Sequence, residues 1–180
     1  SGNLIEAISN GAADGLMLML NVGAMLIAFR SLISLTDFCL TESSVWLMAK
    51  LQMDLPPLTL AGILGWLFTP MAWLMGIPSQ DCAVAGQLLG VKMMATEFVA
   101  YEDLGKLMKL DSPPISERTS VILTYALCGF SNFASIGIQV GGIGAMAPDR
   151  RGELTRLAFR AMLGGTLACC MTGCIAAVLI

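Results

Sequence analysis

The chain has 180 residues, of which 56% are hydrophobic and only 13% are charged, and its net charge is −3. A soluble globular domain usually carries about 25% charged residues, so this chain has too few charges to cover its surface for water, and lipid is the solvent that suits the excess of apolar side chains. Because there is no basic block and no interleaving of basic and aromatic residues, nucleic acid is not an expected partner.

The residue types that carry most enzyme and metal chemistry are scarce. The sequence has no histidine, which removes the commonest general base and metal ligand. The six cysteines show neither zinc-type nor CxxC spacing and lie mostly in apolar runs, where a free cysteine acts as a small hydrophobic residue. No serine or aspartate pair has catalytic spacing. We therefore expect no enzyme activity, no catalytic residues, no bound metal and no cofactor.

The first candidate membrane span covers residues 16–35, which are almost wholly apolar and long enough to cross a hydrocarbon core of about 30 Å. Arg30 lies near its end, and its long side chain is expected to reach the membrane surface. Residues 36–57 mix charges with a double proline and predict a connection that contains a short amphipathic helix. Residues 58–77 are apolar but contain Pro70 and two tryptophans, so a helix lying in the membrane interface fits at least as well as a crossing.

Residues 79–110 have a helical pattern, but no stretch within them is long enough for a clean span. The pattern predicts two short helices that meet near Ala95 and Thr96 and form a re-entrant hairpin, which requires protein or water around its tip. Thr96 can cap the second helix, and Glu97 then lies in its first turn. Lys92, close to the tip, is expected to pair with a carboxylate.

Residues 116–147 predict a broken helix, and residues 150–180 a final span. Ser116 is a capping residue for the first part of the broken helix, and small and polar residues crowd its middle, where freed backbone groups can bind a solute. Residues 161–180 carry no charge, and the arginines that precede them predict that the N-terminal end of this span is cytoplasmic. The sequence thus predicts an all-α, multi-pass protein of the cell (inner or plasma) membrane.

Several blocks of sequence carry a resemblance to one family. They are SNGAADGL (9–16) after Glu6-Ala7, NV (21–22) with AMLIAF (24–29), EFVAY (97–101), YALCGF (125–130), and NFASIGI (132–138) with Pro148, Arg150 and Arg151. In this order they make the chain resemble the C-terminal half of the concentrative nucleoside transporters, along essentially its whole length. One departure is Thr96, where the family often has asparagine.

The resemblance implies a homotrimer of elevator-type transporters built from two inverted repeats. Residues 1–57 correspond to a scaffold transmembrane helix and its connection, and residues 58–180 to the second repeat of the transport domain. Within this repeat, the resemblance implies an interfacial helix (58–77), a re-entrant hairpin (79–110), a broken helix (116–147) and a final span (150–180). The chain begins at Ser1 rather than methionine, and the first repeat is expected upstream of it.

The resemblance also implies a solute site. Glu97, Asn132 and Ser135 correspond to positions that contact the ribose of a nucleoside, and Phe130 to a wall of the pocket. From the residues alone, Glu97 could equally be a solvated acid at a helix start, Asn132 and Ser135 could satisfy a helix break, and Phe130 could be core packing. A carboxylate that accepts hydrogen bonds from the vicinal hydroxyls of a ribose is the chemistry that favours a site.

The function that follows is uptake of nucleosides driven by a sodium or proton gradient. This half would contribute ribose recognition, and the main ion site would lie in the N-terminal half. Two alternatives stay open: an elevator-type transporter for another polar solute, and a non-transporting subunit of a membrane assembly built on the same scaffold. The expected partners are the nucleoside, the lipid bilayer and two further copies of the chain.

Overall fold

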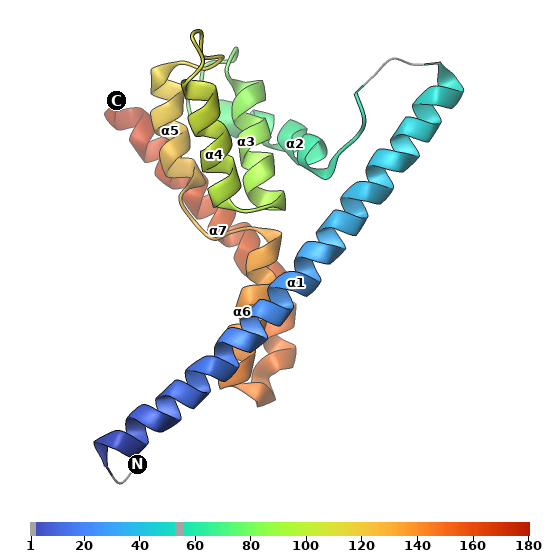
Figure 1. The fold of residues 1–180 in the computed structure, drawn as a ribbon. Helices are drawn as coiled ribbons and strands as arrows, with labels where there is room; N and C mark the ends of the chain where they lie inside the picture. Colours follow the sequence, from blue (N-terminus) through green and yellow to red (C-terminus); the bar gives the residue numbers. More distant parts are fainter. Residues whose placement is uncertain (1–2, 53–55) are drawn as a thin grey trace.

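The computed structural model describes residues 3–52 and 56–180, and every regular element within them is a helix (Figure 1). The elements in chain order are α1 (Leu4–Leu51), α2 (Leu60–Leu74), α3 (Cys82–Met94), α4 (Glu97–Met108), α5 (Glu117–Leu127), α6 (Phe133–Met146), the 3-10 turn η1 (Pro148–Arg150) and α7 (Arg151–Leu179). The expected all-α class is confirmed. The division into a scaffold and a transport repeat stays a prediction.

The first helix differs most from the sequence-based expectation. α1 is one continuous helix of 48 residues, where the sequence predicts a span of 16–35 followed by a separate short helix. No proline interrupts residues 4–51, so none of them lacks the backbone N–H that the helical ladder needs. The Thr36 and Ser43 hydroxyls donate to carbonyls of the preceding turn and so need no partner outside the helix. At 1.5 Å per residue, α1 is about 72 Å long. Part of the predicted connection, residues 53–55, lies outside the described residues.

α2 and α3 pack with their backbones nearly in contact. A Cβ added at Gly90 of α3 would lie 2.6 Å from the backbone nitrogen of Gly65 on α2, and one at Gly86 would lie 2.5 Å from the Gly65 carbonyl oxygen. Only residues without a side chain allow such an approach. α2 is therefore fixed against the first helix of the hairpin.

The helices α2 to α7 pack into one body with a shared hydrophobic core. α3 and α4 lie side by side, α5 packs on α7, and α1 crosses the body where it contacts α6 (Figure 1). The core includes Met75, Ile122, Leu123 and Leu127, which are almost fully buried. By contrast, α1 has no buried residue among those described.

Among the described residues, two helical segments are long and apolar enough to cross a membrane: Leu4–Leu51, and Pro148–Leu179, which is η1 with α7. Large apolar side chains also cover much of the outer surface; Trp66 is 79% exposed and Val178 is 85% exposed. α3, α4, α5 and α6 have only 11 to 14 residues each, fewer than the roughly 20 that a full crossing needs.

Candidate functional site

The tip of the helical hairpin meets the break between α5 and α6. The Asn132 side-chain amide donates a hydrogen bond from Nδ2 to Oε2 of Glu97 at 3.1 Å, joining residues that are 35 positions apart. Glu97 is 6% exposed and Asn132 is 2% exposed. The structure therefore brings together two of the residues that the sequence singles out.

Glu97 owes its position to the start of α4. Thr96 stands at the N-cap in an extended conformation, and Glu97 is the first helical residue, where the positive end of the helix dipole favours a carboxylate. The Thr96 hydroxyl makes no capping hydrogen bond, although the sequence predicts a cap here. The N-terminal amides of α4 thus face the tip without a side-chain cap.

Asn132 is held by a capping box at the start of α6. Its Oδ1 accepts a hydrogen bond from the Ser135 backbone N–H at 2.8 Å. The Ser135 hydroxyl in turn accepts from the Asn132 N–H at 3.2 Å and donates to the Asn132 carbonyl at 2.6 Å. Ser135 is 3% exposed, and in this geometry its first role is to hold Asn132 in place.

The second carboxylate oxygen of Glu97 has no partner within the part of the chain that the structure describes. Oε1 is buried and accepts no hydrogen bond. Leaving a buried charged acceptor unsatisfied costs on the order of 1–3 kcal/mol or more, and buried polar atoms are otherwise almost always paired. With one N–H of Asn132 still available, this pair offers an acceptor and a donor side by side.

Two exposed aromatic rings, Phe98 and Phe130, lie within two positions of Glu97 and Asn132 in the sequence. Phe130 is 65% exposed and Phe98 is 70% exposed, and their rings form an edge-to-face pair with centroids 6.5 Å apart. Gly129 makes the turn that presents Phe130: its φ is +149°, and an added Cβ would lie 2.6 Å from the Cys169 sulfur. Phe98 was not predicted as a site residue, although it directly follows Glu97.

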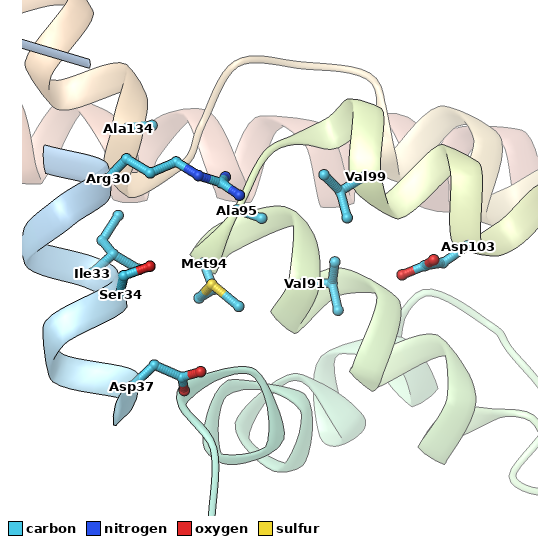
Figure 2. Close-up of a pocket in the computed structure, with 10 residues that line it drawn as sticks. All are labelled: Arg30, Ile33, Ser34, Asp37, Val91, Met94, Ala95, Val99, Asp103 and Ala134. Atoms are coloured by element: carbon cyan, nitrogen blue, oxygen red, sulfur yellow. The ribbon is translucent and has the colours of Figure 1, made fainter. Parts of the chain in front are cut away.

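A cavity of about 340 Å³ lies between α1 and the hairpin tip (Figure 2). Ala95 and Ala134 form part of its wall, so it opens close to the meeting point of the tip and the break. Arg30 extends from α1 toward Ala95 across this space, as Figure 2 shows. Arg30 is exposed and lines this cavity with its side chain, and its reach to the membrane surface stays a prediction. Asp37 and Asp103 line the same cavity.

Two buried charges support this region. The sequence predicts that Lys92 pairs with a carboxylate, but it has no such partner among the residues that the structure describes. Its Nζ donates instead to the Ala126 carbonyl at 3.0 Å. Asp81, which the sequence did not single out, accepts through Oδ2 from the Ser116 N–H and hydroxyl and from the Thr119 hydroxyl, at 3.0, 2.8 and 2.7 Å. Asp81 thereby ties the start of the hairpin to the start of α5.

A hairpin of short helices and a broken helix, whose ends meet at buried polar groups beside long apolar helices, is the class of arrangement that membrane transporters use. Residues 1–177 match the family described as "Na+ dependent nucleoside transporter C-terminus". The chain belongs to this family. Its relatives are transporters and not enzymes.

Individual relatives agree with the family. The chain is 43% identical to an uncharacterized transporter of Haemophilus influenzae, over 99% of this chain and 42% of that protein. It is 41% identical to the nucleoside permease NupC of Helicobacter pylori, over 99% of this chain and 41% of that protein. The chain thus spans about two-fifths of the length of these relatives.

Solved structures of the transporter CNTnw share the fold. A double variant in an outward-facing state superposes with a TM-score of 0.90 at 38% identity, over 98% of this chain and 42% of that one. CNTnw in an inward-facing, substrate-bound state gives a TM-score of 0.69 at 38% identity, over 98% of this chain and 41% of that one. The arrangement of helices is therefore closer to the outward-facing structure.

Proposed function

We propose that this chain is the C-terminal part of a sodium-dependent transporter that takes up nucleosides, and that its hairpin tip and helix break bind the ribose. The observation that carries the proposal is that, within the described residues, the buried Oε1 of Glu97 has no hydrogen-bond partner and Asn132 beside it uses only one of its two amide N–H groups. A ribose offers two adjacent hydroxyls, each of which can donate to a carboxylate and accept from an amide. This arrangement fits a sugar better than an anion, which the Glu97 charge would repel.

Each predicted site residue has a distinct part in the proposal. Glu97 accepts hydrogen bonds from the vicinal hydroxyls, and Asn132 donates to one of them. The Ser135 oxygen retains one acceptor lone pair beyond its capping bonds and can add a contact. Phe130, paired with Phe98, provides an exposed aromatic surface against which a sugar or base can lie.

The membrane arrangement is part of the same proposal. α1 and α7 cross the bilayer, while α3 and α4, with 13 and 12 residues, enter it as a re-entrant hairpin. α1 belongs to a scaffold at the centre of a homotrimer, and the remaining helices form the second inverted repeat of a domain that moves as an elevator. The close α2–α3 packing supports this division, as does α1, which has no buried residue among those described.

Sodium is the coupling ion in this proposal, because the family is described as sodium-dependent. The resemblance implies that the main sodium site lies in the first repeat. The proposed contribution of this chain is the solute site, so the ion and the sugar are recognised by different halves of one transporter.

The test is a conservative change at Glu97 in the full transporter that contains this chain. Glu97→Gln keeps the size of the side chain but removes the charge, and we expect uridine uptake into proteoliposomes to fall about a hundredfold, because hydrogen bonds to a charged acceptor are lost. Assembly, measured by size-exclusion chromatography, should not change. Glu102→Gln on the same helix is the matched control, since Glu102 is exposed and pairs only with Lys106 on that helix.

Unchanged uridine uptake in Glu97→Gln would contradict the proposed site. If the wild-type protein prefers carboxylates or amino acids to uridine, the fold carries another polar solute. If neither is taken up, the chain belongs to a non-transporting assembly.

A further inference from the structure

Both helices of the hairpin hold the C-terminal end of α5. From α3, Lys92 donates to the Ala126 carbonyl at 3.0 Å; from α4, the Tyr101 hydroxyl donates to the Thr124 carbonyl at 2.6 Å. These carbonyls belong to the last turn of α5, whose C=O groups have no partner within the helix. Another carbonyl of this turn, that of Tyr125, accepts from the Cys128 N–H. The hairpin thus supplies the side-chain caps that end α5.

Burying the Lys92 ammonium costs more free energy than a purely structural cap of α5 requires. Its side chain is 2% exposed, and within residues 3–52 and 56–180 no carboxylate oxygen lies within 4.0 Å of its Nζ. A buried ammonium without a counter-charge is strongly unfavourable, and an apolar side chain usually fills such a position at lower cost. The negative end of the α5 dipole compensates part of this cost, which makes the contact depend on where α5 ends.

Lys92 joins the C-terminal end of α3 to the C-terminal end of α5, and the candidate site residues follow directly after these two ends. Lys92 lies in the last turn of α3, just before the tip that leads to Glu97. Ala126 lies in the last turn of α5, just before the break that carries Phe130 and Asn132. The Asn132–Glu97 hydrogen bond then joins the two segments that follow these helix ends.

We infer that Lys92, assisted by Tyr101, is a positioning residue that sets the placement of the break relative to the hairpin tip and so determines solute affinity without touching the solute. This inference rests on the proposed function. A binding constellation must be held within about 0.5 Å to work, and the tethers at Ala126 and Thr124 fix the backbone immediately before the break.

The experiment compares two basic side chains that each cap a helix end in the full transporter. Lys92→Met removes the ammonium and keeps the length of the side chain; Arg118→Met removes the bond from Arg118 to the Ala177 carbonyl at the end of α7, which is 2.6 Å long. We expect Lys92→Met to raise the KM for uridine uptake about tenfold or more, with a smaller change in maximal rate. Arg118→Met should lower the melting temperature but leave KM unchanged.

Two further variants keep the inference testable if Lys92→Met folds poorly. Tyr101→Phe removes only a hydroxyl from the same helix end, and we expect KM to rise about threefold, the factor typical of one neutral hydrogen bond. When Lys92→Met or Tyr101→Phe is combined with Asn132→Ala, the effects on KM should be less than multiplicative, because both changes loosen the same contact. Equal KM values for Lys92→Met and Arg118→Met, or fully multiplicative effects, would overturn the inference.

A readout without transport separates this inference from the proposed function. Cys128 is exposed and forms the C-cap of α5. Its rate of maleimide labelling, measured by mass spectrometry in the absence of solute, should rise in Lys92→Met but not in Arg118→Met. An unchanged labelling rate in Lys92→Met would refute the positioning role of Lys92. Normal uptake in Glu97→Gln together with faster labelling in Lys92→Met would refute only the proposed nucleoside site.

Discussion

At the residue scale, the Glu97 carboxylate is hydrogen-bonded on one side only. Oε2 accepts from Asn132, and Oε1, which is buried, accepts from no group in the described chain. A side chain that only capped or packed a helix start would turn toward water or a donor. An acceptor held buried and open is the arrangement expected of a residue that waits for a ligand donor.

Asn132 has two tasks that substitution can separate. Asn132→Ser keeps a good N-cap for α6 but loses the donor to Glu97, while Asn132→Ala loses both. We expect both variants to raise the KM for uridine about tenfold, because both lose the donor to Glu97. Asn132→Ala should be about 1 kcal/mol less stable than Asn132→Ser, because it also loses the cap of α6. Thermal unfolding and uptake kinetics on the same preparations check this. A normal KM in Asn132→Ser would show that the amide contributes only as a cap.

The residues that the sequence singles out and the structure brings together are those with a local pattern. Glu97 and Asn132 each begin a helix within a family block, and this much is readable from the chain. Lys92 and Asp81 were misassigned or missed because their partners, Ala126 and Ser116, lie 34 and 35 positions away in sequence. The partner of Lys92 is also a backbone carbonyl, and no side-chain pattern reports on a carbonyl.

At the element scale, short helices end where local chemistry ends them. Ser116 caps α5 through a hydrogen bond from the Thr119 N–H, as the sequence indicates. Asn132 caps α6, which was not predicted from the sequence. The hairpin turn falls at Ala95 and Thr96, between α3 and α4, where the sequence predicts it. The predicted length of the first helix was wrong because charged residues such as Asp37 and Glu42 suggest a loop but do not break a helix. A proline, which removes a backbone N–H, would break it, and residues 4–51 contain none.

The α2–α3 contact gives an element-scale prediction. In Gly90→Ala, the added methyl would lie 2.6 Å from the Gly65 nitrogen and 2.7 Å from the Ala61 carbonyl oxygen, so the two helices must separate. We expect a loss of stability of about 1–3 kcal/mol, measured by thermal unfolding in detergent. Gly105→Ala on α4 is the matched control: nothing lies within 4 Å of the new methyl, and better helix propensity should leave the protein equally or more stable. Equal melting temperatures for the two variants would contradict the close packing.

At the scale of the whole molecule, one long helix crosses a compact body that carries the polar site. α1 contacts this body chiefly through α6, and the cavity between α1 and the hairpin tip lies beside the site (Figure 1, Figure 2). In the elevator movement that we propose, the body would slide along α1 and open and close this space while the Glu97–Asn132 contact stays intact. Such a motion is consistent with the unequal TM-scores against outward-facing and inward-facing CNTnw.

The most direct measurement is a binding cycle between the solute hydroxyls and Glu97 in the full transporter. Affinities for uridine and 2′,3′-dideoxyuridine are determined for the wild type and for Glu97→Gln by equilibrium binding. The account predicts that the wild type binds uridine about a hundredfold more tightly than the dideoxy analogue, and that Glu97→Gln loses most of this difference. Equal discrimination by the two proteins would show that the ribose hydroxyls are recognised elsewhere, which contradicts the account.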